Sequence, residues 1–426
     1  MTLSQRVTVL TLALACSAGA ATARAADWPQ WRGPNRDGLS SEKGLLQEWP
    51  EAGPKLVWQI DDLGDGYSTP AVAKGRLYLI ANKGLDDEFL KVLDAKDGKE
   101  IWSTRLGKVG NPEQKPSYPG SRSTPTVDGK LVFALGSDGD LACVDAESGD
   151  VQWQKNLRKE FAGKPGIWAY SESPLIDGNL LICTPGGGKA TLVALDKKTG
   201  ETVWKSSLPE ADDAAYASPI VFEAGGARQY VQLLQKGLVG LDAKTGDLLW
   251  RYRRPISRFD ANIPTPLAYD TYIYVASAGT GGGTVKVEKS DQDKFTPEEV
   301  YFTPQLPTAI GGAVKIGDYL YGTTNQALLC VEFKTGAVKW HERALGAASL
   351  CYADERLYLH GENGDVALVD PSPESYRQKG RFTPPDQPND PKSMGKPWAY
   401  PVVANGRLYI RDRDLLWAFD VESTSK

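Results

Sequence analysis

Ten side chains of the kinds that bind small planar molecules stand at equivalent places along this chain, each shortly before an apolar, strand-like run. They are Tyr67, Arg122, Trp168, Tyr170, Glu172, Tyr216, Asp260, Asn262, Trp398 and Tyr400. Aromatic rings mixed with a few charged groups can line a pocket for a planar ligand. The same rings could instead pack on one another and close a channel. The sequence leaves both alternatives open.

Other kinds of reactive site have little support, and no catalytic residue is assigned. His341 and His360 are the only histidines, and each falls in a strand-like run, so neither a His-based triad nor a zinc site is expected. The glycine runs 186–188 and 281–283 precede no helix and no Lys-Ser or Lys-Thr pair, which predicts loops rather than phosphate-binding turns. No C-x-x-C-H occurs, so no attached c-type haem is expected.

One repeated phrase must build the elements that position the ten residues. An Asp, a Gly and a Trp recur at fixed spacing in Asp94-Gly98-Trp102, Asp145-Gly149-Trp153, Asp196-Gly200-Trp204 and Asp242-Gly246-Trp250, and Glu replaces Asp in Glu332-Gly336-Trp340. The apolar runs on either side predict a hairpin, with Gly where the turn needs positive φ. The Asp carboxylate can bind turn N–H groups, and the Trp can fill the gap between neighbouring sheets. We interpret these residues as structural.

A second hairpin alternates with the first, and it begins with Ser or Thr before Pro, as at Pro70, Pro125 and Pro174. Two hairpins make one four-stranded sheet, and eight such units of roughly 46 residues fit residues 55–426. Residues 55–58 form a returning strand without its partner, and residues 416–420 form a strand without its return. We therefore predict an all-β, eight-bladed β-propeller of four-stranded antiparallel blades, closed by pairing of the N- and C-terminal strands.

The phrase A-x-D-x-x-T-G-x-x-x-W resembles the repeat of the pyrroloquinoline-quinone (PQQ) propeller superfamily, over nearly the whole chain after residue 25. The resemblance implies one of two branches. Quinoprotein dehydrogenases hold PQQ and Ca²⁺ on the axis of an eight-bladed ring. BamB-like proteins are non-catalytic rings that assist outer-membrane protein assembly. The segment DWPQWRGP at residues 27–34 also resembles secreted PQQ-like proteins of planctomycete-type bacteria.

The chain departs from the dehydrogenase branch in several respects. It has no adjacent cysteine pair, and the calcium-binding Glu and Asn and the catalytic Asp of that branch cannot be matched residue by residue. The resemblance therefore favours a non-catalytic, BamB-like scaffold that binds envelope proteins and needs no cofactor or metal. The alternative is a PQQ- and Ca-dependent alcohol or sugar dehydrogenase. Carbohydrate binding through the aromatic residues ranks last.

The first 25 residues predict a secretory signal peptide. Arg6 precedes the apolar run 7–15, and Ala23-Arg24-Ala25 is a cleavage signature. The alternative is a lipoprotein that is anchored to the membrane by a lipid at Cys16. The predicted location, periplasmic or secreted, permits disulfides. Nevertheless, the remaining cysteines lie in apolar runs and are expected to be buried, with any pairing left open; they are Cys143, Cys183, Cys330 and Cys351.

The net charge and the hydropathy of the chain limit the classes of partner that we expect. The net charge of −5 becomes −7 once Arg6 and Arg24 are removed, which argues against nucleic acid. No later apolar run is long enough for a transmembrane helix. We expect a monomer in three parts: a signal peptide at 1–25, an N-terminal extension at 26–54 and the propeller at 55–426.

Four long connections are the expected partner-binding loops. They run from Lys108 to Arg122, from Arg158 to Glu172, from Arg251 to Pro264 and from Pro371 to Pro397. Each leaves an outer strand and returns to an inner one, so all four are expected on one face around the axis, and extra length on one face indicates a partner. The basic cluster Arg251, Arg253, Arg254 and Arg258 could pair with nearby acids or contact an acidic partner, but we favour a solvated loop.

Overall fold

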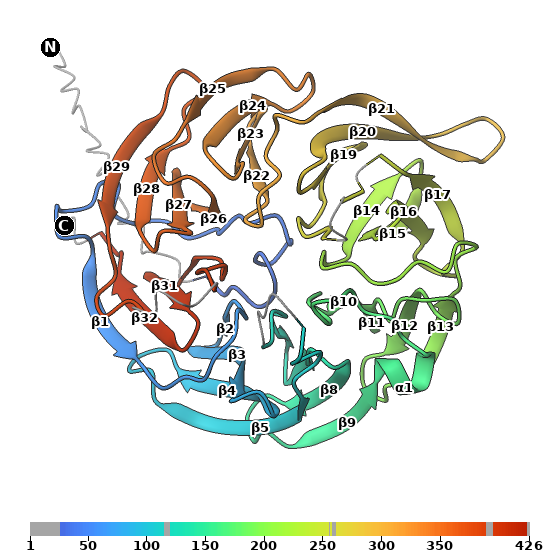
Figure 1. Cartoon of the computed structure of the whole chain (residues 1–426), viewed down its shortest axis with the longest axis horizontal. Coiled ribbons are helices and arrows are strands. Elements are labelled where there is room, and N and C mark those ends of the chain that lie inside the picture. The colour runs from blue at the N-terminus through green and yellow to red at the C-terminus, as the bar shows by residue number, and fades with distance from the viewer. Residues whose placement is uncertain (1–25, 115–119, 255, 258–260, 389–394, 424–426) are drawn as a thin grey trace, which may run out of the picture.

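In the computed structural model, eight antiparallel sheets of four strands stand around a central axis like the blades of a propeller (Figure 1). The structure describes residues 26–114, 120–254, 256–257, 261–388 and 395–423. The predicted signal peptide and Asp260 lie outside these residues, as does Arg258. The predicted fold is confirmed, including its closure, because β1 (Lys55–Ile60) pairs with β32 (Leu415–Asp420) near the other end of the chain.

Each blade runs from an inner strand at the axis to an outer strand at the rim. The inner strands are β2 (Ala71–Ala73), β6 (Thr126–Asp128), β10 (Leu175–Asp177), β14 (Ile220–Ala224), β18 (Leu267–Tyr269), β22 (Ala313–Ile316), β26 (Ala348–Ala353) and β30 (Val402–Ala404). The second strands are β3 (Arg76–Lys83), β7 (Leu131–Leu135), β11 (Leu180–Cys183), β15 (Ala227–Leu234), β19 (Tyr272–Ser277), β23 (Tyr319–Thr323), β27 (Arg356–Gly361) and β31 (Arg407–Asp412).

The two remaining positions complete the blades. The third strands are β4 (Asp87–Asp94), β8 (Asp140–Asp145), β12 (Leu192–Asp196), β16 (Gly237–Asp242), β20 (Gly281–Lys289), β24 (Leu328–Glu332), β28 (Val366–Asp370) and β32. The outer strands are β5 (Glu100–Lys108), β9 (Val151–Asn156), β13 (Thr202–Ser206), β17 (Leu248–Tyr252), β21 (Phe295–Thr303), β25 (Val338–Glu342), β29 (Arg377–Phe382) and β1. One short helix, α1 (Leu157–Phe161), follows β9.

The hydrophobic core is a series of layers between neighbouring blades. One cluster joins Phe133 and Cys143 of the second blade to Cys183 and Val193 of the third. Successive clusters join the other blades in the same way. All four cysteines in the described residues are buried and free. Because two blades share each layer, a blade is stable only against its neighbours.

The repeated phrase forms what we call the interblade wedge, made of the turn glycines and the rings packed against them. At Gly98, Gly149, Gly200, Gly246 and Gly336, an added Cβ would come between 2.5 and 3.0 Å from the ring of the preceding blade. These rings belong to Trp58, Trp102, Trp153, Trp204 and Tyr301. Only glycine fits at positive φ against a ring. Several rings also reach a carbonyl: Trp153 Nε1 donates to Lys197 O at 3.0 Å, and the Tyr301 hydroxyl donates to Phe333 O at 2.7 Å.

The expected loop at residues 281–283 is wrong, because these glycines begin strand β20. An added Cβ on Gly283 would come 2.1 Å from Tyr301 O, and one on Gly282 would come 2.4 Å from the Tyr274 hydroxyl. The glycines therefore allow close packing within a strand. In Figure 1, β20 and β21 form a hairpin that projects beyond the ring.

The N-terminal extension crosses the ring face and reaches the axis, as the blue ribbon of Figure 1 shows. Trp28 pairs with Val72 of β2, and Arg36 donates to Ser173 O at 2.6 Å, just before β10. Further along, Leu39 pairs with Tyr352 of β26. Burial lowers the pKa of Arg36 to about 9, and carbonyl oxygens rather than carboxylates accept its hydrogen bonds. The extension thus spans the middle of the propeller.

Candidate functional site

A cavity of about 290 Å³ opens at the axis; we call it the axial cavity. Its lining residues are Trp31, Tyr67, Thr69, Arg122, Trp168, Ser171, Tyr216, Ala261, Ile263, Ile310, Trp398 and Tyr400. The sequence-predicted members of this lining are Tyr67, Arg122, Trp168, Tyr216, Trp398 and Tyr400. The structure thus gathers these six around one space, although they are spread over more than 330 residues of sequence.

Backbone hydrogen bonds between neighbouring loops hold the lining residues in place. Tyr67 N donates to Ser121 O at 2.8 Å, which ties the segment before β2 to the segment before β6. Tyr216 N donates to Asn262 O at 3.0 Å in the same manner. The residue positions are therefore set by the loops that precede the inner strands, as the sequence suggests.

The aromatic residues present ring surfaces to the cavity because their polar atoms are bonded elsewhere. Trp31 Nε1 donates to Thr265 Oγ1 at 2.9 Å, and Trp398 Nε1 donates to Glu362 Oε1 at 2.9 Å. The Tyr400 hydroxyl donates to Ile310 O at 2.7 Å. Ring pairs stabilise the wall: the centroids of Trp31 and Tyr400 lie 4.6 Å apart, edge to face. The cavity is therefore suited to an apolar or aromatic group.

Two polar groups at the cavity could orient an occupant. The Arg122 guanidinium donates from Nη1 to the carbonyls of Gly120 and Trp168, both at 3.0 Å, and lies 5.5 Å from the centre of the Tyr67 ring. Burial lowers the pKa of Arg122, yet an arginine remains a cation in proteins. Ser171 is 9% exposed, and its hydroxyl has no hydrogen-bond partner among the described atoms. An occupant that carries one hydrogen-bond acceptor or anionic group would fit this arrangement.

Three predicted site residues lie away from the cavity and bond to the protein. The Tyr170 hydroxyl donates to Pro185 O at 2.8 Å. Glu172 is buried, and its carboxylate accepts from Thr184 N at 2.5 Å and from Gln232 Nε2 at 3.1 Å. Asn262 Nδ2 donates to Leu234 O at 2.7 Å. Each ties its own loop to another segment of the protein; the fourth, Asp260, lies outside the described residues.

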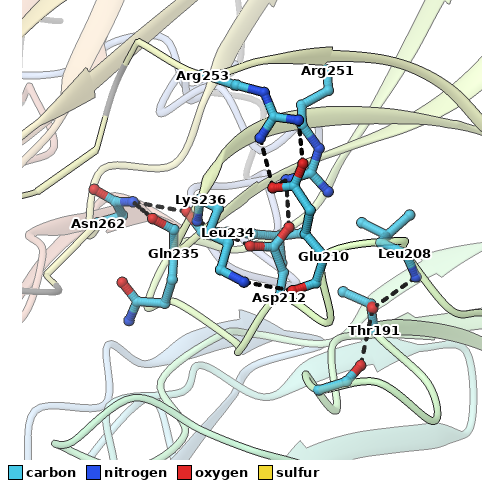
Figure 2. Close-up of polar contacts among 11 residues, drawn as sticks. Thr191, Leu208, Glu210, Asp212, Leu234, Gln235, Lys236, Arg251, Arg253 and Asn262 are labelled. Atoms are coloured by element: carbon cyan, nitrogen blue, oxygen red, sulfur yellow. Dashed lines mark hydrogen bonds and ion pairs between the residues drawn. The ribbon is translucent and has the colours of Figure 1, made fainter.

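An ion-pair network fixes the loop that leads to Tyr216 (Figure 2). Asp212 is fully buried, and its carboxylate accepts from Arg251 Nη1 at 2.5 Å, while Arg253 pairs with Glu210. The interpretation of the basic cluster as a solvated loop is therefore wrong for Arg251, whose side chain is 8% exposed. The partner acids lie some 40 residues earlier, in the preceding blade connection between β13 and β14, so spacing gave no signal of the pairing.

Several lining residues have no counterpart in the sequence prediction. Trp31 enters the cavity from the N-terminal extension, which the repeat does not include. Thr69 and Ser171 are small hydroxyl residues beside predicted aromatics, and Ala261, Ile263 and Ile310 are apolar. For Trp31, the aromatic pair in DWPQWRGP was a possible signal, because a purely surface segment has little reason to carry two tryptophans.

The described residues do not fit a calcium–quinone centre. Calcium takes six to eight oxygen ligands. None of the described lining residues is an Asp or a Glu, and no group of three or more His, Cys, Asp or Glu that could hold a metal is found in the described part of the chain. The oxygens of Glu172 and Asn262 already accept hydrogen bonds from Thr184, Gln232, Ser257 and Ser277.

Residues 86–342, more than half of the chain, match the family described as outer membrane protein assembly factor BamB. Curated relatives include a serine/threonine-protein kinase AfsK of Streptomyces griseus, 27% identical over 38% of this chain and 19% of that protein. They also include BamB of Moranella endobia, 24% identical over 40% of each protein. A quinone-dependent alcohol dehydrogenase subunit of Komagataeibacter europaeus is 30% identical over 35% of this chain and 21% of that protein. The aligned part of the chain spans less than half of the length of each of these three relatives.

Solved structures of similar proteins agree on the architecture. The crystal structure of BamB from Moraxella catarrhalis aligns with 88% of this chain and all of its own, with a TM-score of 0.58 and 16% identity. At that identity the likeness concerns the fold. No helix among the described residues is long and apolar enough to cross a membrane.

Proposed function

We propose, for a chain that belongs to the outer membrane protein assembly factor BamB family, a role as an exported, non-catalytic propeller that binds protein partners in the cell envelope. The observation that carries this proposal is the convergence of the unrepeated connections on the axial cavity. Three of the four contribute lining residues: Arg122, then Trp168 and Ser171, then Ala261 and Ile263. The fourth, expected to leave an outer strand at Pro371, instead contains the outer strand β29, and the lining residue Trp398 follows its end. Loops carried on a rigid ring are common partner-binding elements.

Two exposed apolar residues on these connections support the same role. Ile167 is 44% exposed and Ile256 is 39% exposed, and they lie on two of these connections. An apolar side chain of a partner segment would enter the axial cavity while Ile167 and Ile256 contact the segment around it. Arg122 would bind a carboxylate or carbonyl of that segment. Outer-membrane protein assembly is the process in which we place this binding, and the envelope is its location.

The proposal is tested by complementation in the host. We expect deletion of the chain to lower the amount of assembled outer-membrane proteins, and the wild-type chain to restore it. The double variant Ile167→Asp/Ile256→Asp should not restore it, because a charge opposes apolar contact. The control is Val151→Asp/Val203→Asp, which places the same charges on rim residues that are 44% and 55% exposed. Equal rescue by both variants, with both chains present at wild-type levels, would contradict the proposed face.

A quinone-dependent dehydrogenase is the second candidate, and the aromatic walls with one cation are the observation in its favour. Equilibrium dialysis of the purified chain against PQQ, with and without Ca²⁺, separates the two functions. We expect no saturable binding, since the described residues supply no calcium ligands. Saturable PQQ binding that Trp168→Ala removes, together with dye reduction by alcohols or sugars, would replace the scaffold proposal. The likeness of residues 27–34 to secreted planctomycete-type proteins remains a prediction.

A further inference from the structure

The N-terminal extension begins at a buried carboxylate. The backbone nitrogen of Ala26 lies 2.6 Å from Glu42 Oε1. Glu42 is only 1% exposed, although it belongs to a surface-crossing segment. A carboxylate in such a place must be compensated, because burying an ionised group without a partner costs several kcal/mol.

The remaining partners of Glu42 are neutral. Its carboxylate accepts from Asn405 N at 2.7 Å and from Gly406 N at 3.1 Å, both in the turn between β30 and β31. None of the ion pairs found within the described residues includes Glu42. Three backbone N–H groups thus surround a buried negative charge, and one of them belongs to Ala26. A positive charge at that nitrogen would complete the site.

We propose that Ala26 is the N-terminus of the mature chain and that its α-ammonium group forms a buried ion pair with Glu42. The bond between Ala25 and Ala26 ends the predicted cleavage signature. Its hydrolysis adds one water: Ala25 leaves with the new carboxylate, and Ala26 keeps an amine that takes up a proton at neutral pH. The amide donates one N–H, whereas the ammonium donates three and carries the missing charge.

The ion pair would make the position of Trp31 in the axial cavity depend on cleavage of the signal peptide. Two residues after Ala26, Trp28 pairs with Val72 of β2 through 2.7 and 2.8 Å backbone bonds. Trp31 then enters the cavity lining. Fixing the nitrogen of Ala26 restricts the few residues that place Trp31. Removal of the leader therefore converts the hydrogen bond of Ala26 into the ion pair that anchors this wall of the cavity.

Glu42 also has other ionisable neighbours. Tyr358 of β27 and Tyr409 of β31 face its charge, and burial raises the pKa of both hydroxyls above its usual value. Asp354 is paired with Lys43 at 3.4 Å, and Arg407 with Asp420 at 2.7 Å. The α-amino group is thus the group that changes charge between pH 7 and 10. Pairing with Glu42 would raise its folded pKa, so its stabilisation would be present below the unfolded value near 8 and lost as pH rises through the higher folded value.

The first test determines the N-terminus and its pKa. N-terminal sequencing of the exported protein should begin at Ala26; lipidated Cys16 or another cut would overturn the proposal. NMR of the chain that begins at ¹⁵N-labelled Ala26 should show an α-amino pKa about one unit or more above the usual value near 8. A chain that begins at Ala25 keeps every other side chain and should show the usual value. Equal values in the two chains would also overturn the proposal.

The second test measures coupling with Glu42. Acetylation of the Ala26 amine should lower Tm by about 2–4 °C at pH 7. In Glu42→Gln the same acetylation should leave Tm unchanged, because no carboxylate remains to pair with the ammonium. An equal drop in both chains would refute the ion pair, since the loss would then arise from the added acetyl group. If Glu42→Gln does not fold, the comparison of the Ala25 and Ala26 chains still decides.

Discussion

The interblade wedge and the axial cavity use the same kinds of residues for opposite purposes. In the wedge, each ring lies against a glycine of the next blade, as Trp204 does against Gly246. In the cavity, Trp168 and Trp398 are partly exposed and lie beside other rings, with space between them. The wedge repeats the same residue types from blade to blade, whereas the cavity residues stand at equivalent places but vary in type, as Tyr67 and Arg122 do. Residue types that repeat therefore identify positions that stabilise the ring, and positions where the type varies identify candidate binding residues.

Trp204→Ala should have the largest effect and would test the wedge directly. The side chain is 9% exposed, and its Nε1 donates to Ala243 O at 3.3 Å. Removing it leaves a cavity between two blades and an unpaired carbonyl, so we expect a loss of about 3–5 kcal/mol in the free energy of unfolding. Urea denaturation measures this loss. A loss below about 1 kcal/mol would mean that the wedge does not hold the blades together.

Gly246→Ala should come next. The residue has φ of +77°, and an added Cβ would lie 2.5 Å from the Trp204 ring, so we expect a loss of about 2–4 kcal/mol. Gly178→Ala is the matched control: its φ is +59°, but nothing lies within 4 Å of the added Cβ. It should lose only about 1 kcal/mol, the cost of the left-handed backbone alone. Equal losses in urea denaturation would show that the ring contact contributes nothing.

The pH dependence distinguishes carboxylates at the rim from those near the axis. Turn N–H groups lower the pKa of Asp196, whereas burial raises the pKa of Glu172 to about 7. For Glu172 the folded pKa exceeds the unfolded value, so its contribution is full below about pH 4 and is lost as pH rises through 7. For Asp196 the sign is opposite, and its contribution is lost as pH falls below about 4.

Glu172→Gln tests that sign. Between pH 5 and 8, we expect the free energy of unfolding of the wild type to fall by about 1–3 kcal/mol more than that of the variant. The variant also changes one hydrogen bond, but that offset does not depend on pH. Asp196→Asn serves as the rim control and should leave the profile between pH 5 and 8 unchanged. Identical slopes for Glu172→Gln and wild type would contradict a raised pKa.

The sequence predicts the wedge well because its residues act locally. Asp, Gly and Trp meet within one hairpin and its neighbour, so their spacing alone shows the blade and its turn. The incomplete hairpins at residues 55–58 and 416–420 predict the closure of the ring. The cavity is harder because its residues meet only across the axis. A position just before an inner strand correctly identified six lining residues. Tyr170 and Glu172 have the same kind of position, but they bond to neighbouring loops and do not line the cavity. Trp31 comes from outside the repeat, so the repeat could not predict it. No sequence pattern indicates that the Glu42 side chain is buried.

Trp168→Ala should have the smallest effect on stability and the sharpest effect on function. Its ring is partly exposed and lies 6.0 Å, centroid to centroid, from the Tyr216 ring, while the Trp168 backbone bonds to Tyr216 and Arg122. We expect a loss of only about 0.5–1.5 kcal/mol in urea denaturation, together with loss of rescue in the complementation assay. If Trp168→Ala instead destabilised the chain as much as Trp204→Ala and left rescue intact, the axial rings would be packing residues. The difference between wedge and cavity would then concern sequence repetition alone.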